Sequence, residues 1–213
     1  MAMQKIDPSR DALIVVDIQN DFCPGGALAV SDGDAVVAVA NALIPRFTNV
    51  VLTQDWHPAG HTSFASSHAG QAPFDRIDMS YGGQTLWPDH CVQGSNGAEF
   101  HRDLVTNSAH LVIRKGYDSA IDSYSAFYEN DQTTPTGLTG YLRTCGISRV
   151  FLLGLATDYC VHYSTMDARK EGFDAIVIED GCRAIDLDGS LARAMADMKA
   201  AEVIFSTSEQ VAD

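Results

Sequence analysis

Four apolar segments of this chain each lead directly into a residue with charged or reactive chemistry. The runs ALIVV, VVLTQ, LVIR and VFLLGLATDY are followed by Asp17, Asp55, Lys115 and Cys160. If these runs are parallel strands, their carboxyl ends share one edge of a sheet, where open α/β folds place ligands and catalytic groups. A carboxylate, an ammonium group and a thiol on one edge predict a nucleophile with its activating groups.

The apolar runs and the segments between them predict the fold class. Strands are expected at 12–16, 49–53, 110–114, 149–154, 174–178 and 202–206. The runs are continuous rather than alternating, which is typical of parallel strands covered on both faces. Helical spacing of apolar residues falls at 34–47, 136–145, 158–171 and 189–200. We therefore expect an α/β, doubly wound, mainly parallel six-stranded sheet with helices on both faces, a Rossmann-like three-layer arrangement.

The length predicts one domain with an elaborated loop. The chain has 213 residues, of which 46% are hydrophobic, enough for one sizeable core over 1–213. Residues 56–98 lack a clear periodicity and are rich in Gly, Ser and Pro. A connection this long inside a compact domain usually has a function, so we expect it to bind a metal and the substrate.

The charge and the cysteines indicate the kind of partner and compartment. Twenty-eight acidic and 14 basic residues give a formal charge of −14, which disfavours nucleic acid and anionic membrane surfaces as partners. No run approaches the roughly 18–20 apolar residues of a membrane span. The five cysteines form no CxxC pair and are odd in number, which argues against a disulfide framework. We expect a cytoplasmic protein with reduced thiols.

Cys160 is the candidate nucleophile. The segment GLATDYC predicts a strand, a tight turn and a helix with Thr157 or Asp158 as its N-cap. The first helical turn and a nearby Lys115 are expected to lower the pKa of the thiol. The backbone amides of Cys160 and Ala156 could hold the oxygen of a tetrahedral intermediate.

Two further carboxylates follow strands. Asp17 should be buried, so it needs a partner, and Lys115 with Cys160 would supply one. Asp180 follows AIVIE and precedes Cys182, which makes it the rival site. We expect Asp180 to order a loop instead.

A metal site is expected beside the nucleophile. Asp55 and His57 are two residues apart, so they lie on the same side of an extended strand end, and His61 and His90 follow in the long loop. Imidazole and carboxylate ligands suit zinc, iron or manganese. Because no cysteine belongs to this cluster, a closed structural zinc site is disfavoured, and three protein ligands would leave positions open.

Five ordered motifs resemble those of a known family. They are VDIQNDFCPGGAL at 16–28, TQDWHPAGHTSFA at 53–65, LWPDHCVQGSNGAEF at 86–100, KGYDSAIDSYSAF at 115–127 and GLATDYCV at 154–161. The chain resembles the isochorismatase-like family of cysteine hydrolases. Within that family, the pairing of DWH with WPDHC is similar to the nicotinamidase branch.

The resemblance implies a role for each site residue. It implies a catalytic triad of Cys160, Asp17 and Lys115, and an oxyanion hole formed by Ala156 and Cys160 with a cis peptide bond before Ala156. Phe22 and Trp87 are implied as walls around the substrate ring, and Tyr124 as the residue that closes the pocket. It also implies one divalent ion bound by Asp55, His57 and His90, with zinc as the first choice of metal and iron or manganese as alternatives. A further ligand is implied at either His61 or, through water, Ser63.

The activity implied by the resemblance is amide hydrolysis. Nicotinamide and water would give nicotinate and ammonia through a cysteine thioester, in NAD salvage, and pyrazinamide would give pyrazinoate by the same route. A carbamoyl, ureido or other small amide is an alternative substrate, and a thiol-based redox or metal sensor is an alternative function. The expected partner is a small-molecule substrate. Whether the chain also forms a homo-oligomer is left open.

Overall fold

Six parallel strands form the central sheet of the protein, whose computed structural model describes residues 3–213. They are β2 (Asp11–Val16), β3 (Asn49–Asp55), β6 (Leu111–Lys115), β7 (Arg149–Leu155), β8 (Asp174–Arg183) and β9 (Ile204–Ser206). Their order across the sheet is β6-β3-β2-β7-β8-β9, and every neighbouring pair is parallel. The predicted parallel sheet is therefore confirmed, with β2 near its centre.

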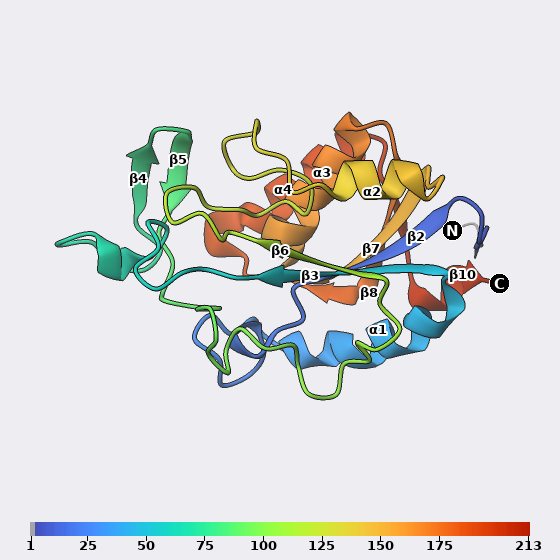
Figure 1. Ribbon diagram of the computed structural model, residues 1–213, viewed down its shortest axis with the longest axis horizontal. Helices are drawn as coiled ribbons and strands as arrows, with labels where there is room; N and C mark the ends of the chain where they lie inside the picture. Colours follow the sequence, from blue (N-terminus) through green and yellow to red (C-terminus); the bar gives the residue numbers. More distant parts are fainter. Residues whose placement is uncertain (1–2) are drawn as a thin grey trace.

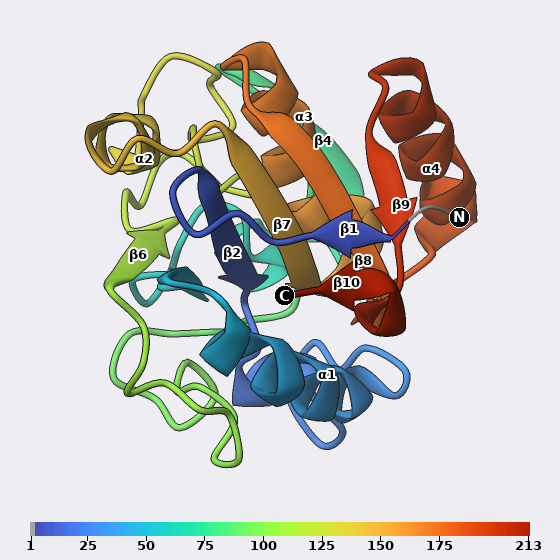
Figure 2. The ribbon, with the colours of Figure 1, turned by 90° about the vertical axis from the view of Figure 1, so that its right-hand side faces the viewer.

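Helices cover both faces of this sheet. They are α1 (Val36–Leu43), α2 (Leu138–Thr144), α3 (His162–Lys170) and α4 (Ser190–Ala200). α1 lies on one face, and α2 and α3 lie on the other (Figures 1 and 2). Short 3-10 turns flank α1, and the turn at Ile44–Arg46 contains Pro45, which lacks the N–H that would continue the helix. Within residues 3–213, no helix combines the length and apolarity that a bilayer span requires.

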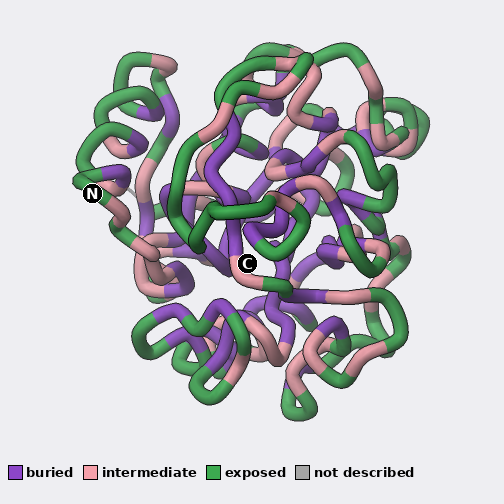
Figure 3. Tube along the Cα trace, turned by 90° about the vertical axis from the view of Figure 1, so that its left-hand side faces the viewer, coloured by how far each residue is buried: buried purple, intermediate pink, exposed green. Residues whose placement is uncertain are grey.

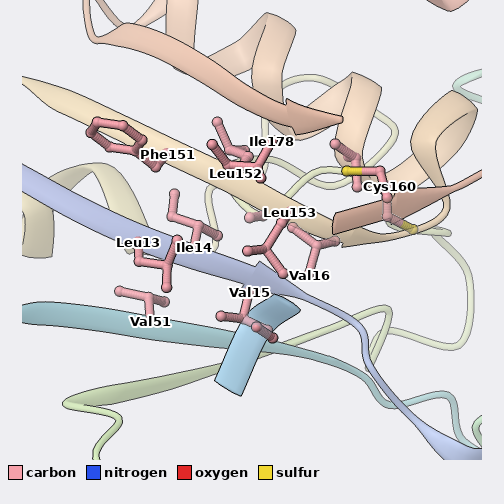
Figure 4. Close-up of a cluster of buried hydrophobic side chains, with 14 of the residues drawn as sticks. Leu13, Ile14, Val15, Val16, Val51, Phe151, Leu152, Leu153, Cys160 and Ile178 are labelled. Atoms are coloured by element: carbon pink, nitrogen blue, oxygen red, sulfur yellow. The ribbon is translucent and has the colours of Figure 1, made fainter. Parts of the chain in front are cut away.

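The continuous apolar runs are explained by burial on both faces of the strands. All six residues of β2 are buried, and the same core includes Val51 of β3, Leu152 of β7 and Ile178 of β8 (Figure 4). The exposed chain lies mainly in the loops and on the outer faces of the helices (Figure 3). Figure 4 also places Cys160 just beyond the carboxyl ends of these strands.

The long loop contains a hairpin that we did not predict. Strands β4 (Arg76–Met79) and β5 (Gly82–Thr85) pair antiparallel and project from the body of the protein (Figure 1). β4 alternates polar and apolar residues over only four positions, and β5 contains no apolar residue, so the sequence carries little signal for this pair. A second unpredicted pair joins β1 (Gln4–Lys5) to β10 (Val211–Ala212) in parallel.

Asp180 lies within a strand rather than after one, which corrects our expectation. β8 extends to Arg183 past a register irregularity opposite Leu152 and Gly154. The Asp180 carboxylate accepts hydrogen bonds from the backbone and the hydroxyl of Ser208. It therefore orders the loop after β9, as we expected of it.

Gly154 packs against the central strand too closely for any side chain. Its φ is 128°, and a Cβ added there would lie 2.0 Å from the Val16 carbonyl oxygen. We expect Gly154→Ala to lower the free energy of unfolding by about 2–4 kcal/mol, because the backbone must shift. Urea denaturation would measure this loss. Gly140→Ala is the matched control, since Gly140 lies in α2 with open space around it, and it should stabilise by about 0.5–1 kcal/mol.

Candidate active site

The structure brings Asp17, Lys115 and Cys160 together at the carboxyl edge of the sheet. Lys115 Nζ lies 2.8 Å from Asp17 Oδ2 and 3.4 Å from Cys160 Sγ. Asp17 follows β2, Lys115 ends β6 and Cys160 lies in the turn after β7, so three separate strands supply the three groups. All three side chains are buried. Together they can form a nucleophile with an adjacent base and cation.

Lys115 also reaches the second predicted cluster. Its ammonium donates to Asp55 Oδ1 at 2.9 Å and to the carbonyl of Ser123 at 3.0 Å. Burial alone would lower the pKa of Lys115, but the carboxylates of Asp17 and Asp55 outweigh it and hold that pKa well above its usual range. The ammonium therefore stays charged and links the two sites.

The thiol is not activated in the way that we expected. Burial raises the pKa of Cys160 well above its usual value, the carboxylates of Asp17 and Asp55 raise it further, and Lys115 only partly offsets this. The expected lowering of the thiol pKa was wrong, because the site is far drier than a helix terminus in water. Burial also raises the pKa of Asp17, against the effect of Lys115. A neutral thiol beside a basic carboxylate suits proton transfer to Asp17.

The turn that carries Cys160 differs from the predicted helix start. Thr157–Val161 form a π-helical turn, in which the N–H of Val161 bonds to the carbonyl of Ala156 at 3.1 Å, and α3 begins only at His162. Thr157 and Asp158 therefore lie inside the turn, and neither caps it. Asp158 instead accepts from the backbone of Ile185 and Asp186 at 3.0 and 2.8 Å, and from the Ser190 hydroxyl. These bonds fix the nucleophile turn to Ile185 and Asp186 and to the first residue of α4.

Side chains replace the backbone ladder where β2 ends. The ladder between β2 and β3 stops at the pair Val15 and Leu52, and Asp17 then turns into the left-handed region with φ 46°. Beyond this point the side-chain amide of Gln19 donates to the Asp55 carbonyl at 2.8 Å and accepts from the Asp55 N–H at 2.7 Å. Gln19 thus holds the backbone of Asp55 as a neighbouring strand would.

One cavity opens onto Cys160 and contains the predicted aromatic residues. Its lining residues are Phe22, Leu28, Asp55, Trp87, His90, Asp122, Tyr124, Ala156, Tyr159, Cys160 and Ile185. Trp87 Nε1 donates to the Tyr124 hydroxyl at 3.1 Å. The rings of Trp87 and Tyr159 meet edge to face, with their centroids 4.8 Å apart. The Leu155–Ala156 peptide bond is cis. A mostly apolar cavity with a few convergent polar groups suits a small flat molecule.

Asp55, His57 and His90 form a group that fits a divalent metal ion. One ligand atom from each lies within 4.8 Å of the others, and His57 Nε2 and His90 Nε2 lie 3.2 and 3.3 Å from Asp55 Oδ2. The opposite ring nitrogens are held by backbone carbonyls, His57 Nδ1 by Gly116 at 2.9 Å and His90 Nδ1 by Pro88 at 2.8 Å. Metal-binding histidines are commonly oriented in this way.

The predicted further ligands lie beside this group with other partners. His61 Nδ1 lies 2.8 Å from the Ser63 hydroxyl, and His61 Nε2 lies 2.7 Å from the carbonyl of Asp118. A second group of possible ligand atoms joins His57, His61 and Asp122. His61 would have to give up one of its present contacts in order to bind an ion.

Gly116 keeps the lysine strand in contact with the metal group. Its φ is 67°, and a Cβ there would lie 2.4 Å from Cε1 of His57. The same residue supplies the carbonyl that holds His57 Nδ1. No side chain can therefore stand between Lys115 and His57.

Sequence reasoning missed several residues of this site. Asp122, Tyr159, Leu28 and Ile185 line the cavity, and Gln19 and Thr53 hold other site residues. Thr53 could have been found, because it stands two residues before Asp55 on β3 and so faces the same side. The others depend on how the loops fold and leave no local signal.

A buried thiol, ammonium and carboxylate at the edge of a doubly wound sheet are typical of cysteine hydrolases. The family model of the isochorismatase domain matches residues 11–210. The chain therefore belongs to the isochorismatase family.

Characterised relatives are similar over almost the whole chain. A nicotinamidase of Acinetobacter baylyi is 53% identical over 192 residues, 90% of each chain. The structure of the nicotinamidase and pyrazinamidase of Acinetobacter baumanii superposes with a TM-score of 0.94 at 53% identity, covering 96% of this chain and 99% of that one.

Two further structures are known with bound molecules. PnC1 from L. infantum in complex with nicotinate has a TM-score of 0.86 at 40% identity and covers 99% of this chain and 98% of that one. The pyrazinamidase of Pyrococcus horikoshii in complex with zinc has a TM-score of 0.76 at 36% identity, and the match covers 93% of this chain and 99% of that one.

Lys115 balances two buried carboxylates, so its loss should destabilise the fold. We expect Lys115→Met to lower the free energy of unfolding by about 3–5 kcal/mol, because Asp17 and Asp55 would remain buried without their cation. Adding Asp17→Asn should restore part of the loss. Urea denaturation in the presence of a chelator would measure both.

The exposed Lys170 offers a matched control. Lys170→Met should change stability by no more than about 0.5 kcal/mol. An equally small effect of Lys115→Met would contradict the role that we assign to its charge.

Proposed function

We propose that this protein is a nicotinamidase, an amidohydrolase that converts nicotinamide and water to nicotinate and ammonia. The observation that carries the proposal is one cavity lined by aromatic residues, with Cys160 and Ala156 among its lining residues and the metal-binding candidates Asp55 and His90 among the others. A heteroaromatic ring that bears a carboxamide has the shape and chemistry for such a cavity. The nicotinamidase relatives and the nicotinate complex support the same substrate.

The first half of the reaction forms a thioester. Asp17 accepts the proton of Cys160, and the sulfur attacks the carboxamide carbon. The backbone amides of Ala156 and Cys160 stabilise the oxyanion, a kind of contact worth about 3–4 kcal/mol. Lys115 holds Asp17 and stabilises the developing thiolate. The carbon–nitrogen bond then breaks, and Asp17 returns the proton to the departing ammonia.

The second half hydrolyses the thioester. Asp17 takes a proton from water, the hydroxide attacks the thioester carbon, and the carbon–sulfur bond breaks. The thiolate regains the proton from Asp17, so the enzyme returns to its starting state. One carboxylate serves as the base in both halves, which is why its contacts matter for the whole cycle.

Asp55, His57 and His90 are the residues that would hold one metal ion, and we propose zinc, with iron or manganese as alternatives. When bound, the ion would supply a Lewis acid for a ring nitrogen of the substrate. Phe22, Trp87 and Tyr124 enclose the ring. We further propose that the enzyme acts on pyrazinamide and serves NAD salvage in the cytoplasm.

An ammonia-release assay with nicotinamide, with and without a chelator, tests the activity directly. Carbamoyl and ureido compounds in the same assay test the alternative substrates, and faster turnover of one of them would replace nicotinamide in this proposal. Release of more than one equivalent of ammonia per chain would exclude a thiol sensor as the function.

Cys160→Ala should abolish turnover without loss of structure. We expect ammonia release to fall by more than about 1,000-fold, because Cys160 is the only cysteine among the residues that line the cavity. Metal analysis and circular dichroism should show that metal content and fold are unchanged. Substantial residual turnover would rule out covalent catalysis by this residue.

His57→Ala should affect substrate positioning instead of the nucleophile. We expect a lower metal content and a KM raised by at least about tenfold, the equivalent of a lost contact of ~1.4 kcal/mol. Elemental analysis and steady-state kinetics would measure the two effects. His68→Ala is a suitable control, because His68 bonds to the carbonyl of Thr62 outside this group. An unchanged KM after proven loss of metal would contradict a role for the metal in binding the ring.

A further inference from the structure

Thr53 makes two hydrogen bonds to the residue that we propose as the general base. Its hydroxyl accepts from the backbone N–H of Asp17 at 3.1 Å and donates to Asp17 Oδ1 at 2.6 Å. Both residues are fully buried. One hydroxyl thus fixes the backbone of Asp17 and the direction of its carboxylate.

The position of Thr53 follows from the end of the strand ladder. The last β2–β3 pair is Val15 with Leu52, so Asp17 has no backbone partner on β3 at its level. Asp17 also has a φ of 46°, a conformation that few residues other than glycine adopt without local support. The Thr53 hydroxyl supplies that support, since it satisfies the N–H that the ladder leaves free.

The two oxygens of the Asp17 carboxylate have different neighbours. Oδ1 accepts from Thr53 and Oδ2 lies against the ammonium of Lys115. A hydrogen bond on Oδ1 and an ion pair on Oδ2 therefore act on the two oxygens separately, and together they set the orientation of the carboxylate before substrate binds. Preorganised geometry of this kind is what makes a base effective.

We propose that Thr53 is a positioning residue for catalysis, which orients Asp17 for both of its proton transfers. The inference rests on the proposed function, because it assigns Asp17 as the base. Thr53 is not among the residues that line the cavity, and its hydroxyl bonds to Asp17, so it acts through Asp17. Its loss should therefore lower kcat while leaving substrate binding nearly unchanged.

Thr53→Val tests the proposal, since valine keeps the shape and removes the hydroxyl. We expect kcat for ammonia release from nicotinamide to fall by about 10–100-fold, which is part of the 10²–10⁴-fold that general-base catalysis contributes. KM should stay within about twofold of the parent value. Thr53→Ser keeps the hydroxyl and should retain kcat within about threefold. If Thr53→Val does not fold, Thr53→Ala removes the same hydroxyl, and the same outcomes apply.

Thr136→Val is the matched control, because the Thr136 hydroxyl donates to the carbonyl of Ala126 rather than to a site residue. It should change stability without lowering kcat. A folded Thr53→Val variant with the parent kcat, or a Thr53→Ser variant as slow as Thr53→Val, would overturn the proposal, because the role of Thr53 would then be structural only.

Alkylation of Cys160 by iodoacetamide separates this proposal from the choice of substrate. In that reaction the sulfur–carbon bond forms, iodide leaves and the thiol proton passes to Asp17, so no nicotinamide is required. Mass spectrometry of the Cys160 peptide should show alkylation about tenfold slower in Thr53→Val than in the parent and in Thr53→Ser. Equal rates would overturn the positioning role. Failure to turn over nicotinamide, with slow alkylation in Thr53→Val, would instead reject only the substrate.

Discussion

The buried ammonium of Lys115 is the interaction on which the rest of the site depends. Asp17 and Asp55 are carboxylates from different strands, and neither could remain ionised in the core without a nearby cation. A single lysine serves both, so the nucleophile cluster and the metal-binding group are electrostatically one unit. Asp55 completes the link, because Oδ1 faces Lys115 and Oδ2 faces His57 and His90.

The parallel sheet supplies these charges but does not by itself orient them. The backbone pairing of β2 with β3 ends at Val15 and Leu52, before Asp17, whereas Asp55 and Lys115 remain paired with each other at the ends of β3 and β6. Side-chain hydrogen bonds from Thr53 and Gln19 take over at this level and hold Asp17 and Asp55. These bonds hold Asp17 in place, although it lies beyond the pairing of β2 with β3.

The sequence allowed the sheet, the helices and the main reactive residues to be predicted, because strands buried on both faces leave continuous apolar runs that end where the sheet ends. The hairpin β4–β5 could not be predicted, since its polar residues carry no such pattern. The raised pKa of Cys160 and the partners of Asp158 were missed for another reason. They depend on burial and on contacts between residues distant in the chain, which spacing alone does not encode.

Gly116 has a consequence for the metal-binding group. Its backbone is pressed against the His57 ring, and its carbonyl holds Nδ1 at 2.9 Å, so main chain rather than another side chain fixes where this imidazole stands. The ring cannot retreat toward β6 to make room for a larger ion. The size of the ion that Asp55, His57 and His90 would hold is therefore limited by the backbone and not by the choice of rotamer.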